Sequence, residues 1–114
     1  MSNQALVDVC SLGDLAMDSV LKVQAGGHDI ALVRCVDGVF AIGNQCSHAD
    51  VDLSEGEVEG CALECWLHGS QFDVKTGAPL TPPAIVPVPT YRVVLEGEGD
   101  SARVMIDPQP QTDN

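Results

Sequence analysis

Two short stretches decide how this chain folds and what it holds: Cys46-Ser47-His48 and Cys65-Trp66-Leu67-His68. Each stretch offers one thiolate and one imidazole, and sixteen residues separate His48 from Cys65. Thiolates and imidazoles are the side chains that bind zinc and iron in proteins. Matched pairs in two loops rich in glycine and aspartate therefore predict one metal site that both loops build.

The pairing of residue types separates two kinds of metal site. Zinc accepts two cysteines and two histidines, but such sites usually place cysteine with cysteine and histidine with histidine. Here each end mixes the two types, and the first spacing is only Cys-x-His. That arrangement favours a two-iron site, with thiolates on one iron and imidazoles on the other. A structural zinc module stays as the alternative, and it would be colourless.

Composition limits the classes of partner and compartment. The 114 residues fit one domain, and 17 acidic against 5 basic residues give a net charge of −12. Such a surface repels nucleic acid and anionic membranes and is attracted to a basic patch on a partner. No apolar run reaches the ~20 residues of a membrane span. The first residues lack the features of a secretory signal, so we expect a cytoplasmic protein.

Short strands separated by turns dominate the rest of the chain. Glycine and proline punctuate alternating stretches, which is typical of an antiparallel all-β sandwich or barrel. A two-residue turn at Asp37-Gly38 predicts a hairpin. The stretch 11–18 predicts one short helical turn. The strands expected are Ala5–Cys10, Val20–Val23, His28–Cys35, Val39–Ile42, Gln71–Val74, Tyr91–Glu96 and Ala102–Ile106.

Residues 45–70 do not follow the hairpin rhythm. Their acidic residues predict either a solvated loop or a docking rim for a basic partner. The polar tail 107–114 predicts disorder. Five cysteines without a leader favour metal or redox chemistry over disulfides. Cys10, Cys35 and Cys61 are therefore expected to be structural, with Cys10 and Cys35 filling core space as small hydrophobes.

The sequence resembles the Rieske [2Fe–2S] proteins. Its C-S-H and C-W-L-H-G-S stretches match the C-x-H and C-x2-H signature of that family. The similarity continues through Phe72-Asp73, Thr76-Gly77 and Pro82-Pro83, and it covers about residues 5 to 106. The resemblance implies an all-β Rieske fold: an antiparallel β-sandwich base that carries a small cluster-binding subdomain at about residues 43 to 84. Residues 1–106 would form this single domain.

The resemblance also implies the ligands and the role. Cys46 and Cys65 would hold the inner iron of one [2Fe–2S] cluster, and His48 and His68 the outer, more exposed iron. The chain looks like the small Rieske ferredoxins of aromatic-ring dioxygenase systems. Such a protein is a one-electron carrier, loaded by a flavin-dependent ferredoxin reductase and unloaded by a terminal non-heme iron oxygenase. An alternative is a small Rieske subunit of a larger oxidoreductase, such as an assimilatory nitrite reductase.

Two departures from the high-potential members of the family predict a low reduction potential. Those members join the ligand loops by a disulfide, but this chain has Val51 and Leu67 at the two positions. They also place a tyrosine where this chain has Phe72, so one hydroxyl donor is missing. Ser70 is retained and would donate to a bridging sulfide. We therefore expect a midpoint at the low end of the Rieske range of about −150 to +300 mV.

Apolar residues beside the expected histidines suggest how a partner docks. Val51, Leu67 and Pro83 would form a small contact patch. Trp66 stands where relatives commonly have proline, and it would cover the cluster, present an aromatic face to a partner, or only pack locally. Small interfaces, below about 1,200 Å², suit partners that must dock and separate quickly.

Overall fold

The computed structural model describes residues 6–45, 51–66, 69–81 and 86–109. In this part of the chain the regular elements are strands and single 3-10 turns, which confirms the all-β prediction. The strands are β1 (Val7–Ser11), β2 (Ser19–Ala25), β3 (His28–Cys35), β4 (Gly38–Gly43), β5 (Glu57–Glu59), β6 (Ala62–Glu64), β7 (Gln71–Asp73), β8 (Thr90–Tyr91), β9 (Val93–Glu96) and β10 (Arg103–Ile106). The turns are η1 (Leu12–Asp14), η2 (Leu53–Glu55) and η3 (Gly99–Ser101). No helix among the described residues is long and apolar enough to cross a membrane.

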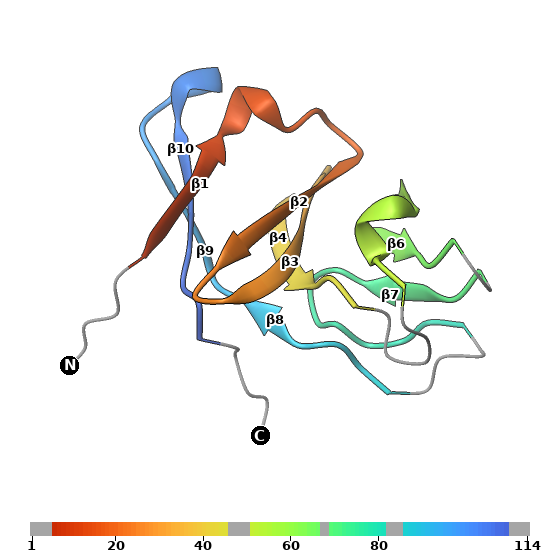
Figure 1. The fold of residues 1–114 in the computed structure, drawn as a ribbon. Helices are drawn as coiled ribbons and strands as arrows, with labels where there is room; N and C mark the ends of the chain where they lie inside the picture. Colours follow the sequence, from red (N-terminus) through yellow and green to blue (C-terminus); the bar gives the residue numbers. More distant parts are fainter. Residues whose placement is uncertain (1–5, 46–50, 67–68, 82–85, 110–114) are drawn as a thin grey trace.

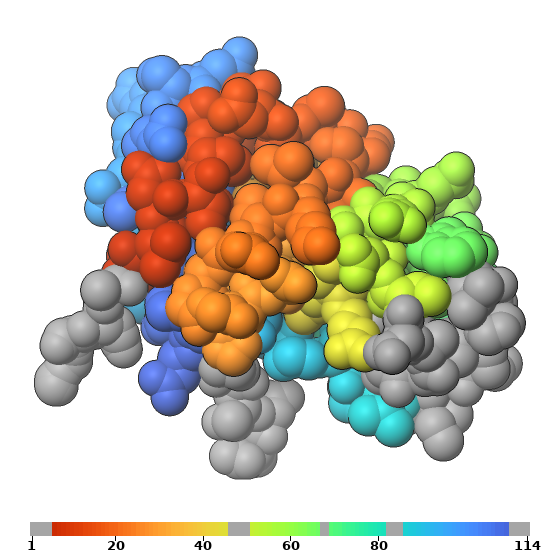
Figure 2. Space-filling model, in the orientation of Figure 1, coloured from red at the N-terminus to blue at the C-terminus, as the bar shows by residue number. Residues whose placement is uncertain are grey.

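The strands form three antiparallel sheets. In Figure 1 they follow one another from the side of the chain termini to the green subdomain. The first sheet has the order β1-β10-β9, the middle sheet β2-β3-β4-β8, and the third β5-β6-β7. The first two sheets form the expected sandwich base. The third belongs to the expected cluster-binding subdomain, which packs against the other face of the middle sheet. Space-filling atoms show base and subdomain joined along the orange and yellow strands (Figure 2).

Two tight turns set the register of the middle sheet. Gly26-Gly27 joins β2 to β3, with φ of 59° and 82°. Two consecutive positive φ angles are what a type I′ hairpin turn requires, and glycine adopts them without strain. The next hairpin closes with Cys35 opposite Gly38, so its loop is Val36-Asp37, one residue earlier than the sequence predicts. Gly38, at φ 134°, then begins β4.

Strand β3 is buried on both faces, which explains its nearly continuous run of apolar residues. Side chains alternate across a strand, so Ile30 and Leu32 enter the core between the two base sheets. Ala31 and Val33 enter the second core, which the middle sheet shares with the subdomain. All four are completely buried. One strand thus forms the wall between the two cores.

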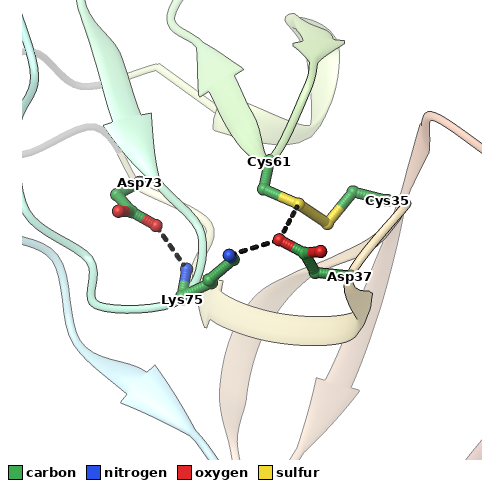
Figure 3. The surroundings of a disulfide bond; sticks show 5 residues. All are labelled: Cys35, Asp37, Cys61, Asp73 and Lys75. Carbon is green, nitrogen blue, oxygen red and sulfur yellow. Dashed lines mark hydrogen bonds and ion pairs between the residues drawn. A yellow bond between two sulfur atoms is a disulfide. The ribbon is translucent and has the colours of Figure 1, made fainter.

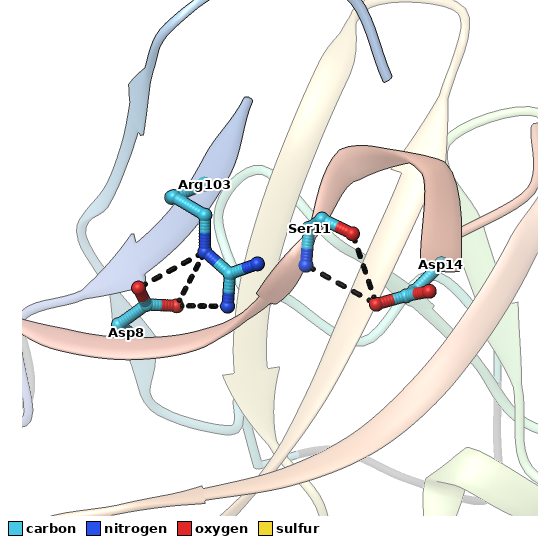
Figure 4. Close-up of polar contacts among 4 residues, drawn as sticks. All are labelled: Asp8, Ser11, Asp14 and Arg103. Atoms are coloured by element: carbon cyan, nitrogen blue, oxygen red, sulfur yellow. Dashed lines mark hydrogen bonds and ion pairs between the residues drawn. The ribbon is translucent and has the colours of Figure 1, made fainter. Parts of the chain in front are cut away.

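Polar contacts fasten the first sheet at the chain termini. The Arg103 guanidinium on β10 donates through Nε and Nη2 to the Asp8 carboxylate on β1, at 2.7 to 3.1 Å (Figure 4). These hydrogen bonds lower the pKa of Asp8. Ser11 donates through its N–H and hydroxyl to Asp14, which closes the turn after β1. Two strands distant in sequence are thereby held in register.

The expected tail begins after β10. Asp107 N–H donates to Arg92 O, and the Asp107 carboxylate accepts from Gln109 N–H. Residues 110–114 lie outside the described residues, so the predicted disorder of the tail stays a prediction.

The stretch between the expected ligands holds a hairpin that its sequence pattern does not predict. Strands β5 and β6 pair antiparallel, with Val58 opposite Leu63, and β6 then pairs with β7. Leu63 is completely buried, whereas Glu57 and Glu59 point to solvent from the edge strand. Charged residues on an exposed edge prevent pairing with another chain. The reading of this stretch as a plain solvated loop is therefore wrong for these residues.

A disulfide corrects the expectation for Cys35 and Cys61. Their sulfurs are bonded, and their Cα atoms lie 5.4 Å apart (Figure 3). Cys35 is buried as predicted, but it is a bridge residue rather than a small hydrophobe. Cys10 is buried and free, which confirms its assignment to the core. Closing a loop over a sequence separation of 26 residues stabilises a fold by about 3.5 kcal/mol in the chain-entropy account.

Candidate metal centre

Asn44 closes the base of the first expected ligand loop. It follows β4 directly, and its N–H donates to Asp29 O in the β2–β3 hairpin. Its carbonyl accepts from Leu53 N–H, and its side-chain oxygen accepts from Ser54 N–H at 2.9 Å. These hydrogen bonds bring residues 44 and 53–54 together. They fix both ends of the loop that carries Cys46 and His48, which themselves lie outside the described residues.

The second expected ligand loop is closed in the same way. Cys65 follows β6, its N–H donates to Ser70 O at 2.6 Å, and its carbonyl accepts from Gly69 N–H at 2.9 Å. Gly69 has a φ of 75°, a conformation that favours glycine. The loop therefore returns at once into β7. Leu67 and His68, at its tip, lie outside the described residues.

Cys65 has the surroundings of a buried metal ligand. Its side chain is completely buried in the core that also contains Leu63 and Phe72. It is one of the two free cysteines among the described residues, although Cys35 and Cys61 of the same core are bonded. A thiol with that burial and no disulfide fits the inner, protected position of a cluster. The described residues contain no group of three or more metal-binding side chains, because three of the four expected ligands lie outside them.

A buried, unpaired side-chain N–H at the base of the first ligand loop is consistent with a hydrogen-bond acceptor that a bound cluster would bring. Asn44 is 2 % exposed, and its side-chain Nδ2 has no hydrogen-bond partner among the described residues. Burying an amide without a partner costs about 1 to 3 kcal/mol. Proteins usually satisfy such groups. This unpaired N–H stands two positions before Cys46, so both loop bases fit a bound cluster. No sequence motif marks Asn44 as the residue that closes this loop.

The remaining expected site residues lie as follows. Ser70 and Phe72 are completely buried, so the phenyl ring of Phe72 fills core space beside Cys65. Val51 is partly buried and packs against the same core. Pro83 lies outside the described residues, together with the rest of residues 82–85, in the segment between β7 and β8 that we call the third loop. The predicted contact patch of Val51, Leu67 and Pro83 thus stays a prediction.

Trp66 is exposed beside the buried ligand position. Half of its surface is accessible, whereas the preceding Cys65 is completely buried. The structure thus favours the aromatic face over local packing. A tryptophan is usually mostly buried, and tryptophan is enriched among the residues that dominate protein interfaces.

The segment after β7 is held against the subdomain by backbone contacts. Leu80 N–H donates to Gln71 O, and Val88 N–H donates to Gly77 O. Gly77 has a φ of 79°, and a Cβ there would lie 2.1 Å from Val88 O. Only glycine therefore allows this close approach. Backbone hydrogen bonds therefore fix the segments before and after the third loop, as they do for the two ligand loops.

Comparison with known proteins assigns the family. The Rieske [2Fe–2S] domain matches residues 5–92. The ferredoxin component of biphenyl 2,3-dioxygenase from Rhodococcus jostii (strain RHA1) is 43 % identical over 94 residues, which cover 82 % of this chain and 88 % of the relative.

Solved structures agree in fold along nearly the whole chain. The ferredoxin of carbazole 1,9a-dioxygenase from Nocardioides aromaticivorans IC177 has a TM-score of 0.86 and 34 % identity, covering 92 % of this chain and 99 % of that one. A complex of reduced oxygenase and oxidized ferredoxin in carbazole 1,9a-dioxygenase contains a match with a TM-score of 0.84 and 29 % identity. That match covers 97 % of this chain and 100 % of the other.

These findings confirm the predicted fold and cofactor. The chain carries one Rieske-type [2Fe–2S] cluster, and its role is electron transfer rather than catalysis. This chain therefore belongs to the Rieske [2Fe–2S] domain family, among the ferredoxin components of aromatic dioxygenase systems.

Proposed function

We propose that this protein shuttles single electrons in the cytoplasm, from a flavin-dependent ferredoxin reductase to the terminal oxygenase of an aromatic-ring dioxygenase. The observation that carries the proposal is the match over nearly the full length of independent ferredoxin chains. One structural relative is itself a ferredoxin in complex with its oxygenase. With a net charge of −12, this chain is not expected to bind nucleic acid or an anionic membrane.

We propose Cys46, His48, Cys65 and His68 as the four cluster ligands. The bound cluster supplies one-electron chemistry at a potential within about −150 to +300 mV. The described residues supply its setting: the closed loop bases hold the ligand positions, and the buried core around Cys65 keeps water from the inner side. Two thiolates in place of four leave the site less negative, so it accepts an electron more readily than a four-cysteine site.

Exposed Trp66 is the described residue that we assign to partner contact. It directly follows the buried Cys65. A single peptide bond therefore joins the residue with the exposed ring to the residue with the buried ligand thiol. A partner that covers Trp66 lies close to the cluster, which shortens the distance for electron transfer.

Spectroscopy of the purified protein tests the cluster and its ligands together. We expect a red-brown protein that bleaches with dithionite and then gives an EPR signal with average g about 1.9, as nitrogen-ligated iron does. Its midpoint should lie below about +100 mV. A colourless protein with stoichiometric zinc would contradict the proposal. Stable co-purification with a large subunit would instead favour the reading as a subunit of a larger oxidoreductase.

Ionic strength should control how fast the reductase loads this protein. The net charge is −12, so a basic docking patch attracts it over long range and salt screens that attraction. We expect the second-order rate constant to fall about tenfold between low salt and about 0.5 M salt. Stopped-flow absorbance with a ferredoxin reductase of a dioxygenase system measures it.

A pair of matched variants locates the attraction. Glu57→Gln with Glu59→Gln removes two exposed charges from β5 in the subdomain, and Glu96→Gln with Glu98→Gln removes two exposed charges from the base. We expect the subdomain variant to show the weaker salt dependence. Equal salt dependence in the two variants would contradict docking at the subdomain.

A further inference from the structure

The Cys35–Cys61 disulfide joins the base to the cluster-binding subdomain (Figure 3). Cys35 ends β3 of the middle sheet, and Cys61 lies in the turn between β5 and β6. This bridge differs from the one between the ligand loops of high-potential Rieske proteins, where this chain has Val51 and Leu67. The Cys35–Cys61 bridge therefore links different parts of the fold from those joined in the high-potential proteins.

The bridge is connected to the cluster through one short strand. Strand β6 occupies the three residues between Cys61 and Cys65. Leu63, in its centre, is completely buried in the core that also contains Cys35 and Cys65. Fixing Cys61 on β3 therefore fixes the start of the strand that delivers Cys65. Opening the bridge removes this covalent tie and leaves only non-covalent contacts at the start of β6.

Cys61 is the more exposed residue of the bridge. Cys35 is 1 % exposed, whereas Cys61 is partly exposed and follows Gly60, whose Cβ position meets no atom within 4 Å. Thiol–disulfide exchange begins when a thiolate attacks a disulfide sulfur that it can reach. The attack would therefore fall on Cys61, and Cys35 would leave.

Polar contacts keep the two segments together when the sulfurs are not bonded. Lys75, which follows β7, forms an ion pair with Asp37 in the β3–β4 hairpin. Within the subdomain, Val74 N–H donates to Cys61 O at 3.0 Å, which holds Cys61 beside the segment that carries Lys75. Asp37 Oδ2 also lies 3.8 Å from Cys61 Sγ, so a reduced Cys61 thiol has an acceptor at hand. These contacts leave the reduced cysteines placed to form the bond again.

We propose that Cys35 and Cys61 form a reversible thiol–disulfide site that controls how tightly the subdomain retains its cluster. A small dithiol reduces it: one thiolate bonds to Cys61 and releases Cys35, and the second thiolate closes the reagent's own disulfide and releases Cys61. Both cysteines gain a proton from the dithiol. Hydrogen peroxide reverses the step, because Cys61 forms a sulfenic acid and one water, and Cys35 then displaces a second water.

The cytoplasm proposed above makes a permanent disulfide unexpected, because reducing systems there keep most thiols reduced. A reversible bond fits that setting. The bond would form when peroxide is present, and the subdomain would then hold its cluster most firmly at the time when the cluster is most exposed to oxidation.

Counting thiols tests the chemistry without reference to the cluster. After removal of iron and denaturation, the protein treated with peroxide should take up three maleimide labels, because two of its five cysteines are bonded. Dithiol treatment before denaturation should raise the count to five, and one equivalent of peroxide should return it to three. A count of five after peroxide, or three after dithiol, would overturn the proposal.

Cluster loss tests the control. Bleaching of the holoprotein by a chelator should be about tenfold faster after dithiol treatment, since loss of the bridge favours local opening. The Cys35→Ala/Cys61→Ala variant should bleach as fast as the reduced protein and should not respond to dithiol. Cys10→Ala, which changes a buried thiol of the other core, should respond as the unaltered protein does. Equal bleaching of oxidised and reduced unaltered protein would overturn the proposal, whether or not the double variant folds.

Discussion

Replacing Cys65 by alanine is expected to abolish cluster binding while the β-sandwich base still folds. Cys65 is completely buried, free of any disulfide, and held at the base of the second loop by hydrogen bonds to Gly69 and Ser70. Even residues that only orient metal ligands cost about 10- to 100-fold in metal affinity when changed. Loss of a ligand thiolate should therefore lower iron per chain by at least about tenfold.

Cys10→Ala is the matched control for Cys65→Ala. Cys10 is also a buried, free cysteine, but it lies in the core between the two base sheets. Its burial raises the pKa of the thiol, which therefore stays protonated. Iron and sulfide analysis, with circular dichroism as the check on folding, should find a full cluster in this variant. A coloured Cys65→Ala protein would show that Cys65 is not a ligand.

The second large effect is expected from Gly56→Ala, which places one methyl group into the β5–β6 hairpin. A Cβ at Gly56 would lie 1.7 Å from Glu64 O, a backbone atom of β6. Backbone cannot turn away as a side chain can, so β5 and β6 must separate. We expect a loss of about 3 kcal/mol or more in the free energy of unfolding. Cluster retention should fall with it, because Glu64 immediately precedes Cys65.

Gly60→Ala tests whether the clash, and not glycine itself, is responsible. Gly60 lies in the same hairpin with a φ of 62°, and nothing stands within 4 Å of its Cβ position. Alanine there should cost only about 1 to 2 kcal/mol for the left-handed conformation. Denaturant titration followed by circular dichroism compares the two variants. Equal losses would contradict the steric account of Gly56.

The base could be read from the sequence because its strands are long and their turns carry clear signals. Gly26-Gly27 marks the first hairpin, Asp37-Gly38 marks the second to within one residue, and β3 has the bounds that the sequence predicts. The ligand types and spacing were equally direct. The placement of Cys46, His48 and His68 stays a prediction, whereas Cys65 is buried as an inner ligand requires.

The missed features depend on contacts that the sequence does not display. Strands β5 and β6 have three residues each, too few to show an alternating pattern. Cys35 and Cys61 meet only because β3 and the β5–β6 turn pack on one core. Asn44 carries no distinguishing motif, and its place at the base of a loop follows from partners nine and ten positions away. The hairpin, the disulfide and the place of Asn44 all depend on packing between residues that are apart in the sequence.

The shared wall formed by β3 has a consequence for any attempt to shorten this protein. Ala31 and Val33 close the subdomain's core, while Ile30 and Leu32 on the same strand close the core of the base. A peptide limited to the ligand loops and their hairpins would lack that wall and expose the apolar side chains that pack on it. The smallest autonomous electron carrier that can be cut from this sequence is therefore almost the entire chain.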